Sequence, residues 1–113
     1  MFKELGQIFG MARNLPKIRE EMEKLQQKLG QLIAEGDAGA GMVKVKVNGR
    51  MEILSYHLSD EAMKLNDREM LEDLLRAATN QGLQKARLMV AEETSKMATG
   101  LGLPPGMGMP GLG

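Results

Sequence analysis

Apolar residues in the first third of the chain recur at the spacing of an amphipathic helix. Positions separated alternately by four and three residues form one hydrophobic seam: Ile18, Met22, Leu25, Leu29 and Leu32. This spacing predicts a helix from about Pro16 to Ala34, because proline suits a first helical turn. A shorter helical piece is expected upstream, joined across a kink at Pro16. So narrow a seam must be buried, either in the core or against a second copy of the chain.

Strict alternation of apolar and charged residues predicts a β-hairpin further along the chain. Valines alternate with lysines over residues 43–47, and an Asn-Gly pair marks the turn. A two-residue turn would mix valines with charges on one face. We therefore expect a three-residue loop, Val47 to Gly49, with Gly49 left-handed and Val43 opposite Ile53. That register gathers four apolar residues on one face: Val43, Val45, Met51 and Ile53. A bend or short third strand is expected near Ser55.

The third periodic segment is predicted to be a helix that begins near Asn66. Asn66 and Glu69 have the spacing of a capping box, and carboxylates crowd the first turn, where the helix dipole is positive. Apolar and small residues then follow helical spacing: Leu71, Leu74, Leu75, Ala78, Gly82, Ala86, Met89 and Val90. The helix is expected to reach about Met97, with a break or tightening near Gly82.

The glycine-rich run between the first helix and the hairpin is predicted to be a connector. Gly36, Gly39 and Gly41 follow a helix and precede a strand, whereas a dinucleotide-binding loop follows a strand and precedes a helix. The Gly-Lys-Ser/Thr ending of a P-loop is absent as well. The single histidine, His57, has no cysteine partner and lies in a predicted strand. We therefore predict no catalytic, metal or cofactor site, no enzyme activity and no small-molecule substrate.

The composition is that of one small domain. The chain has 113 residues, and residues 100–113 contain only Gly, Pro, Leu and Met. We expect a single domain over residues 1–99 and a flexible tail over residues 100–113. No apolar run approaches the roughly 20 residues of a membrane-spanning helix, and cysteine is absent, so a cytoplasmic protein without a membrane partner is expected. The net charge is zero, which disfavours a strongly electrostatic nucleic-acid binder but permits local basic surfaces.

The order of the segments carries a resemblance. An amphipathic helix containing MEKLQQKLGQL leads to GAGMVKVKVNG, then to EMLEDLLRAATNQ, and finally to a tail containing LPPGM. This order resembles the YbaB/EbfC family of bacterial nucleoid-associated DNA-binding proteins over about residues 15–107. One stretch departs from it, because YHLSDEAMKLNDRE differs from the Asp-Pro-containing turn associated with the family.

The resemblance implies an α+β fold with a long N-terminal helix, a small antiparallel hairpin or three-stranded sheet, and C-terminal helices. It further implies a homodimer whose helices project like tweezers and which binds double-stranded DNA in the nucleoid, without catalysis or a cofactor. The residues themselves also favour a dimer, because a lone hairpin is marginally stable in water.

Phosphate contacts are expected from basic residues outside the acidic segment that starts the third helix. The candidates are Lys17, Arg19, Lys24, Lys28, Lys44, Lys46, Arg50, Lys85 and Arg87. The pair Lys24 and Lys28 on the first helix is preferred over the hairpin pair Lys44 and Lys46.

The alternative is a helical, dimeric protein-interaction module that binds another protein through methionine-bearing surfaces and does not bind nucleic acid. The zero net charge and the scarcity of aromatic residues that could stack on bases favour this alternative. The family resemblance favours DNA.

Overall fold

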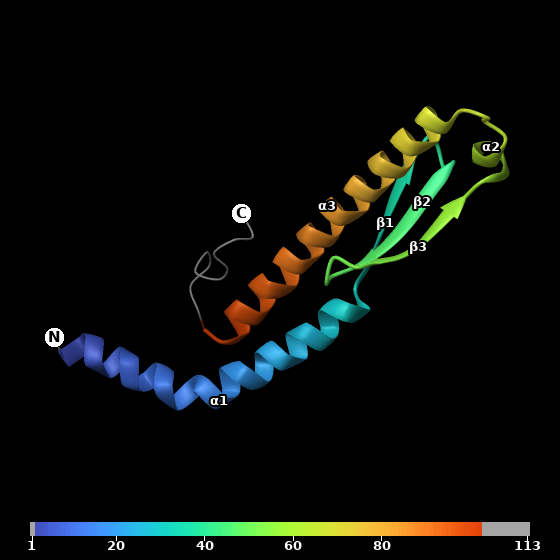
Figure 1. Cartoon of the computed structure of the whole chain (residues 1–113). Helices are drawn as coiled ribbons and strands as arrows, with labels where there is room; N and C mark the ends of the chain where they lie inside the picture. Colours follow the sequence, from blue (N-terminus) through green and yellow to red (C-terminus); the bar gives the residue numbers. More distant parts are fainter. Residues whose placement is uncertain (1, 103–113) are drawn as a thin grey trace.

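The fold is α+β, with two long helices and a three-stranded antiparallel sheet (Figure 1). The computed structural model describes the backbone of residues 2–102 and the side chains of residues 15–102. The elements in chain order are α1 (Phe2–Gln31), β1 (Ile33–Ala38), β2 (Val43–Asn48), β3 (Ile53–Leu58), α2 (Asp60–Met63) and α3 (Arg68–Gly100). The predicted fold class is therefore confirmed for the chain itself. The predicted tail lies outside the described residues from 103 onwards.

Helix α3 covers one face of the sheet and extends past it to lie beside α1 (Figure 1). The strand order is β1-β2-β3, and α3 packs against β1 and β2. As the alternation predicts, Val43, Val45 and Val47 are fully buried, while Lys44 and Lys46 between them are exposed. The valines meet small residues of α3, so the helix lies close to the sheet.

The closest approach in the fold joins β1 to α3 through glycines. A Cβ atom built on Gly36 would collide with the carbonyl oxygen of Ala78 and would lie 2.6 Å from the amide nitrogen of Gly82. A Cβ on Gly82 would in turn lie 3.3 Å from the amide nitrogen of Gly36. The two backbones touch because neither residue carries a side chain.

Two predictions are wrong in the region of strand β1. Helix α1 ends at Gln31 rather than Ala34, and Gly36 belongs to a strand rather than to a connector. The inward positions of this strand are small: Ala34, Gly36 and Ala38. Small inward residues allow α3 to approach, but they give no hydrophobic signal in the sequence. The turn that the glycines do form covers residues 39–42, where Gly39 and Gly41 both have positive φ angles.

The hairpin register is also different from the predicted one. Val43 pairs with Leu58 and not with Ile53, and a bulge separates Lys46 from Val47. The loop is longer than three residues, since Val47 pairs with Ile53. Asn48 organises this loop, because its buried side-chain oxygen accepts hydrogen bonds from the amides of Arg50 (2.9 Å) and Glu52 (3.1 Å).

Within this loop, Gly49 has a different role from the one predicted. Met51, and not Gly49, takes the left-handed conformation, with φ 61°. The amide of Gly49 donates to the carbonyl of Leu29 at 2.8 Å and so satisfies a free carbonyl group at the end of α1. A Cβ on Gly49 would lie 2.6 Å from that carbonyl oxygen. Glycine is therefore required by this close approach.

The helices follow the predicted pattern with shifted ends. Helix α1 continues through Pro16, so the two predicted pieces are one helix. Helix α3 is continuous past Gly82, and its N-cap is Asp67 rather than Asn66; the Asp67 carboxylate accepts from the amide of Met70 at 3.0 Å. Short helix α2 was not predicted; Ser59 caps it by accepting from Ala62 at 3.1 Å.

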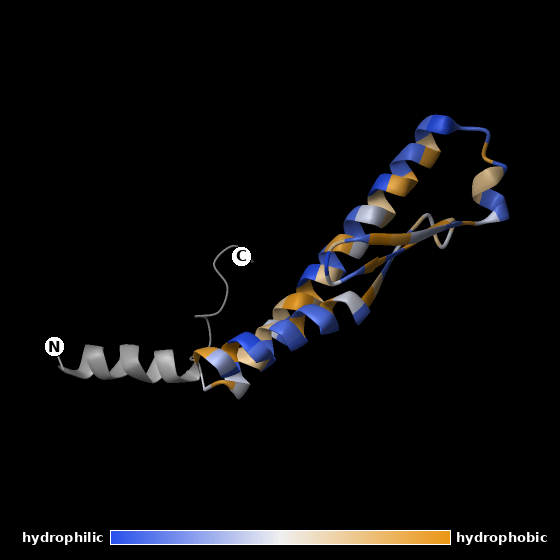
Figure 2. Cartoon of the chain, turned by 60° about the horizontal axis from the view of Figure 1, so that its bottom comes forward, coloured by the Kyte–Doolittle hydropathy of each residue, from blue (hydrophilic) through white to orange (hydrophobic). Residues whose placement is uncertain are grey.

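The predicted seam of α1 is buried over only part of its length. Leu25 and Leu29 pack against Val90 of α3 in the same chain, whereas Met22 is 50% exposed. Figure 2 shows apolar and hydrophilic positions alternating along α3 and along the coloured part of α1, as expected for helices that each bury one face. The C-terminal part of the seam, with Leu25 and Leu29, therefore belongs to the core of the single chain.

Replacement of Gly36 by alanine should destabilise the fold by about 1–3 kcal/mol or more, because the new methyl group would push β1 away from α3. Chemical denaturation of both proteins measures this loss. Gly100→Ala is the matched control, since nothing lies within 4 Å of a Cβ at that position. Equal denaturation midpoints for Gly36→Ala and the parent would contradict the backbone contact.

An ion pair between the long helices should make stability depend on pH. Lys28 Nζ lies 2.6 Å from Glu93 Oε2, and this hydrogen bond holds the pKa of Glu93 below its ordinary value of 4.5, although burial opposes the shift. A lowered pKa contributes stability above pH 4.5 that is lost as the pH falls through the folded-state value. Glu93→Gln should therefore destabilise the protein near pH 7, with a smaller effect near about pH 3.

Urea denaturation at both pH values measures the two differences. Glu20→Gln is the control, because Glu20 belongs to an exposed pair on α1 alone. An equal loss of stability at both pH values in Glu93→Gln would exclude the ion pair as its source.

Candidate nucleic-acid interface

The predicted phosphate-contact residues lie on four separate parts of the fold, and all of them are exposed. Four lie on α1, two on β2, one in the β2–β3 loop and two on α3: Lys17, Arg19, Lys24, Lys28, Lys44, Lys46, Arg50, Lys85 and Arg87. The structure does not gather them into one patch. Their neighbours decide which of them are free to contact a phosphate.

The two preferred lysines of α1 already have carboxylate partners. Lys24 Nζ lies 3.5 Å from the carboxylate of Glu21 and 3.6 Å from that of Glu20. The negative charge of Glu21 has the largest effect and that of Glu20 adds to it, so that the pKa of Lys24 is raised above its ordinary value. Lys28 is bound to Glu93, whose side chain is only 15% exposed. A phosphate would have to displace these carboxylates or share the lysines with them.

Two other candidates hold the fold together. The guanidinium of Arg50 donates to the carbonyl of Gln26 at 3.0 Å, which ties the β2–β3 loop to α1. Lys85 Nζ donates to the backbone carbonyl of Glu35 at 3.2 Å. Arg50 keeps further guanidinium N–H groups for another ligand, because the side chain carries five donors.

The outer face of the sheet, opposite α3, carries Lys44 and Lys46. Cross-strand pairing places Glu35, Lys46 and Ser55 in one row and Asp37, Lys44 and His57 in the next. An open hollow on this face is lined by Glu35, Lys44, Lys46, Ser55, Tyr56 and His57. No ion pair found among residues 15–102 includes either lysine. This face thus offers two exposed lysines with a hydroxyl and an imidazole beside them.

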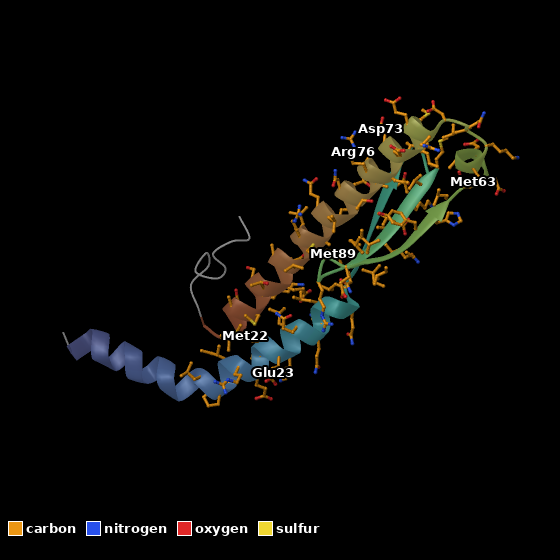
Figure 3. The ribbon with its side chains drawn as sticks, in the orientation of Figure 1. Met22, Glu23, Met63, Asp73, Arg76 and Met89 are labelled. Carbon is orange, nitrogen blue, oxygen red and sulfur yellow. The ribbon has the colours of Figure 1, made fainter. Side chains whose placement is uncertain are left out.

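The acidic segment starts α3 at the end of the molecule that also holds α2. Figure 3 shows Asp73 and Arg76 at this end of α3, far from Met22 and Glu23 on α1. Arg76 pairs with Asp73 at 3.5 Å. The carboxylates are therefore separated from the candidates on α1.

A second hollow lies on α1 and is apolar. It is lined by Leu15, Ile18, Arg19, Met22, Glu23, Gln26 and Gln27. This is the exposed half of the predicted seam.

Within residues 15–102, no group of three or more His, Cys, Asp or Glu residues is placed to hold a metal ion. None of the described helices has the length and hydrophobicity needed to cross a membrane.

Comparison with known proteins identifies the family. Residues 4–101 match the YbaB/EbfC DNA-binding family. The chain belongs to this family. A nucleoid-associated protein of Syntrophobacter fumaroxidans is 40% identical over 104 residues, which cover 92% of this chain and 94% of that protein. A nucleoid-associated protein of Bordetella avium is 39% identical over 105 residues, or 93% of this chain and 96% of that protein.

Structural similarity extends over the same length. The crystal structure of an uncharacterized protein from Helicobacter pylori matches with a TM-score of 0.60 and 26% sequence identity. The match covers 89% of this chain and 96% of that chain. The family resemblance predicted from the sequence is therefore confirmed.

Several contacts of this YbaB/EbfC chain were not predicted from sequence. The most informative is the bond from the amide of Asp37 to the side-chain oxygen of Gln81, at 2.6 Å. The helical spacing places Gln81 beside the apolar stripe of α3, but only the packing of α3 on β1 brings the two groups together.

Proposed function

We propose that this chain binds double-stranded DNA as a homodimer in the cytoplasmic nucleoid, mainly through phosphate contacts. The observation that carries the proposal is the match to a DNA-binding family over residues 4–101, with relatives of about 40% identity named nucleoid-associated proteins. Phosphate contacts require exposed lysines and arginines, but no base-reading or stacking residues.

The outer face of the sheet is the preferred contact surface. Lys44 and Lys46 are exposed and lie outside the ion pairs found among the described residues, whereas Lys24 and Lys28 are engaged by glutamates. This reverses the order of preference that the sequence suggested. Glu35 and Asp37 lie opposite these lysines and would repel phosphates, so we expect weak binding.

The homodimer is supported by the large hydrophobic side chains that the single chain leaves exposed. They are Leu15, Met22, Ile33, Ile53, Leu54, Tyr56, Met63, Met70 and Leu88. Association of two copies would remove part of this surface from water. It would also double the number of lysines on one particle, and the projecting ends of α1 and α3 would form the arms of a tweezer-like assembly.

The double replacement Lys44→Gln/Lys46→Gln should weaken binding to all duplex sequences alike. Each lost phosphate contact should reduce the slope of log affinity against log salt by about 0.9. Gel shifts with several unrelated duplexes across a salt series measure both effects. Lys24→Gln/Lys28→Gln should have a smaller effect.

Arg76→Gln is the matched control, because Arg76 pairs with Asp73 at the acidic end of α3. This replacement should leave the affinity for DNA unchanged. A larger loss in the α1 double variant than in the sheet variant would assign the contact to α1. If folded protein binds no duplex even at low salt, the DNA-binding proposal fails.

The second candidate function is a protein-interaction module. The apolar hollow on α1 favours it, because Leu15 is 55% and Met22 50% exposed beside Ile18. Loss of partner binding in Met22→Glu, with DNA binding intact, would support this candidate.

A further inference from the structure

Helix α3 covers only part of the hydrophobic seam of α1. Leu25 and Leu29 are buried in a cluster with Val90 of α3, and Met97 near the end of α3 packs against the same cluster. The two helices run in roughly opposite directions here, and α3 ends at Gly100 while α1 continues past it (Figure 1). Helix α3 therefore leaves the N-terminal half of the seam uncovered.

This uncovered half is the apolar hollow on α1 described above. Its apolar lining consists of three consecutive residues of the seam, Leu15, Ile18 and Met22, and the first and last of these are exposed. The rest of its lining is polar: Arg19, Glu23, Gln26 and Gln27. A hollow of this kind suits an apolar segment whose backbone carbonyls can accept hydrogen bonds from the guanidinium and the two amides.

The chain itself supplies such a segment where α3 ends. Residues 103–113 read LPPGMGMPGLG, with two leucines, two methionines and no polar or charged side chain. They follow directly on the C-terminal cap of α3, Leu101, which is half-buried. Proline-rich segments lose little conformational entropy on binding, and polyproline conformations leave their carbonyls free to accept hydrogen bonds.

The length of this segment matches the distance that it must cover. Eleven extended residues reach about 36 Å, at roughly 3.3 Å per residue. The hollow extends from Leu15 to Gln27, which is about 18 Å of helix at roughly 1.5 Å per residue. Figure 3 places Met22 close to the end of α3, in agreement with the packing of Met97 against the α1 cluster. The segment therefore starts beside the hollow and can cover all of it.

We propose that residues 103–113 dock in the apolar hollow on α1 of the same chain and extend the cover that α3 gives to the rest of the seam. Attachment at the end of α3 gives this segment a high effective concentration at the hollow, which favours it over a separate partner. The proposal differs from the flexible tail expected from the sequence, and it does not depend on DNA binding. A partner protein that used the hollow would first have to displace the docked segment.

A spin label on the segment tests the contact in the full chain. The chain has no cysteine, so Gly111→Cys supplies one thiol for a nitroxide and keeps every apolar side chain of the segment. The nitroxide broadens NMR signals by an amount that falls steeply with distance. The amide signals of Ile18 and Met22 should lose most of their intensity. Leu88 on α3, which is 66% exposed, and Met63 at the far end of the molecule (Figure 3) should keep theirs.

A charge in the hollow should release the segment. Met22→Lys should restore the signal of Ile18, because an apolar segment cannot satisfy a buried ammonium group. Leu88→Lys is the matched control and should leave the broadening of Ile18 unchanged. Chains that carry only the isotope, mixed with chains that carry only the nitroxide, report contacts between copies, and Ile18 should keep its intensity in this mixture.

Three outcomes decide the proposal. Loss of the Ile18 signal within one chain, reversed by Met22→Lys and not by Leu88→Lys, supports docking. Equal intensities at Ile18 and Leu88 overturn it, because the segment then has no preference for the hollow. Broadening of Ile18 that arises in full in the mixture assigns the hollow to the segment of another copy and overturns docking within one chain. The affinity for DNA is measured separately by the gel shifts, so the two proposals can fail independently.

Discussion

The backbone contact between β1 and α3 determines the arrangement of the other elements. Gly36 and Gly82 let a strand and a helix touch without intervening side chains, and Ala78 completes the contact. Because α3 is held so close to β1, it covers β1 and β2 and leaves β3 open. The same placement brings Gln81 and Lys85 within hydrogen-bonding distance of the β1 edge. One close approach thus also brings polar side chains of α3 to the backbone of the first strand.

The sequence predicts the elements whose hydrophobic period is strong. The valine–lysine alternation of β2 and the helical spacing of α3 are both confirmed, because large or regularly spaced side chains must be buried on one face. Strand β1 is not predicted because its buried positions are alanine and glycine, which are also common in linkers. Alternation is present there too, with Glu35 and Asp37 outward, but small residues bury too little surface to distinguish a strand from a loop.

The structural role of a glycine cannot always be predicted from its neighbours in the sequence. Gly49 sits beside an asparagine in a turn, so a positive φ was the natural expectation, yet the residue is required by its distance to the carbonyl of Leu29. That distance depends on how α1 meets the hairpin and cannot be read from neighbouring residues. The ion pair between Lys28 and Glu93 has the same origin, since it joins residues of two helices. Sequence identifies exposed basic residues correctly but does not tell which of them are already paired.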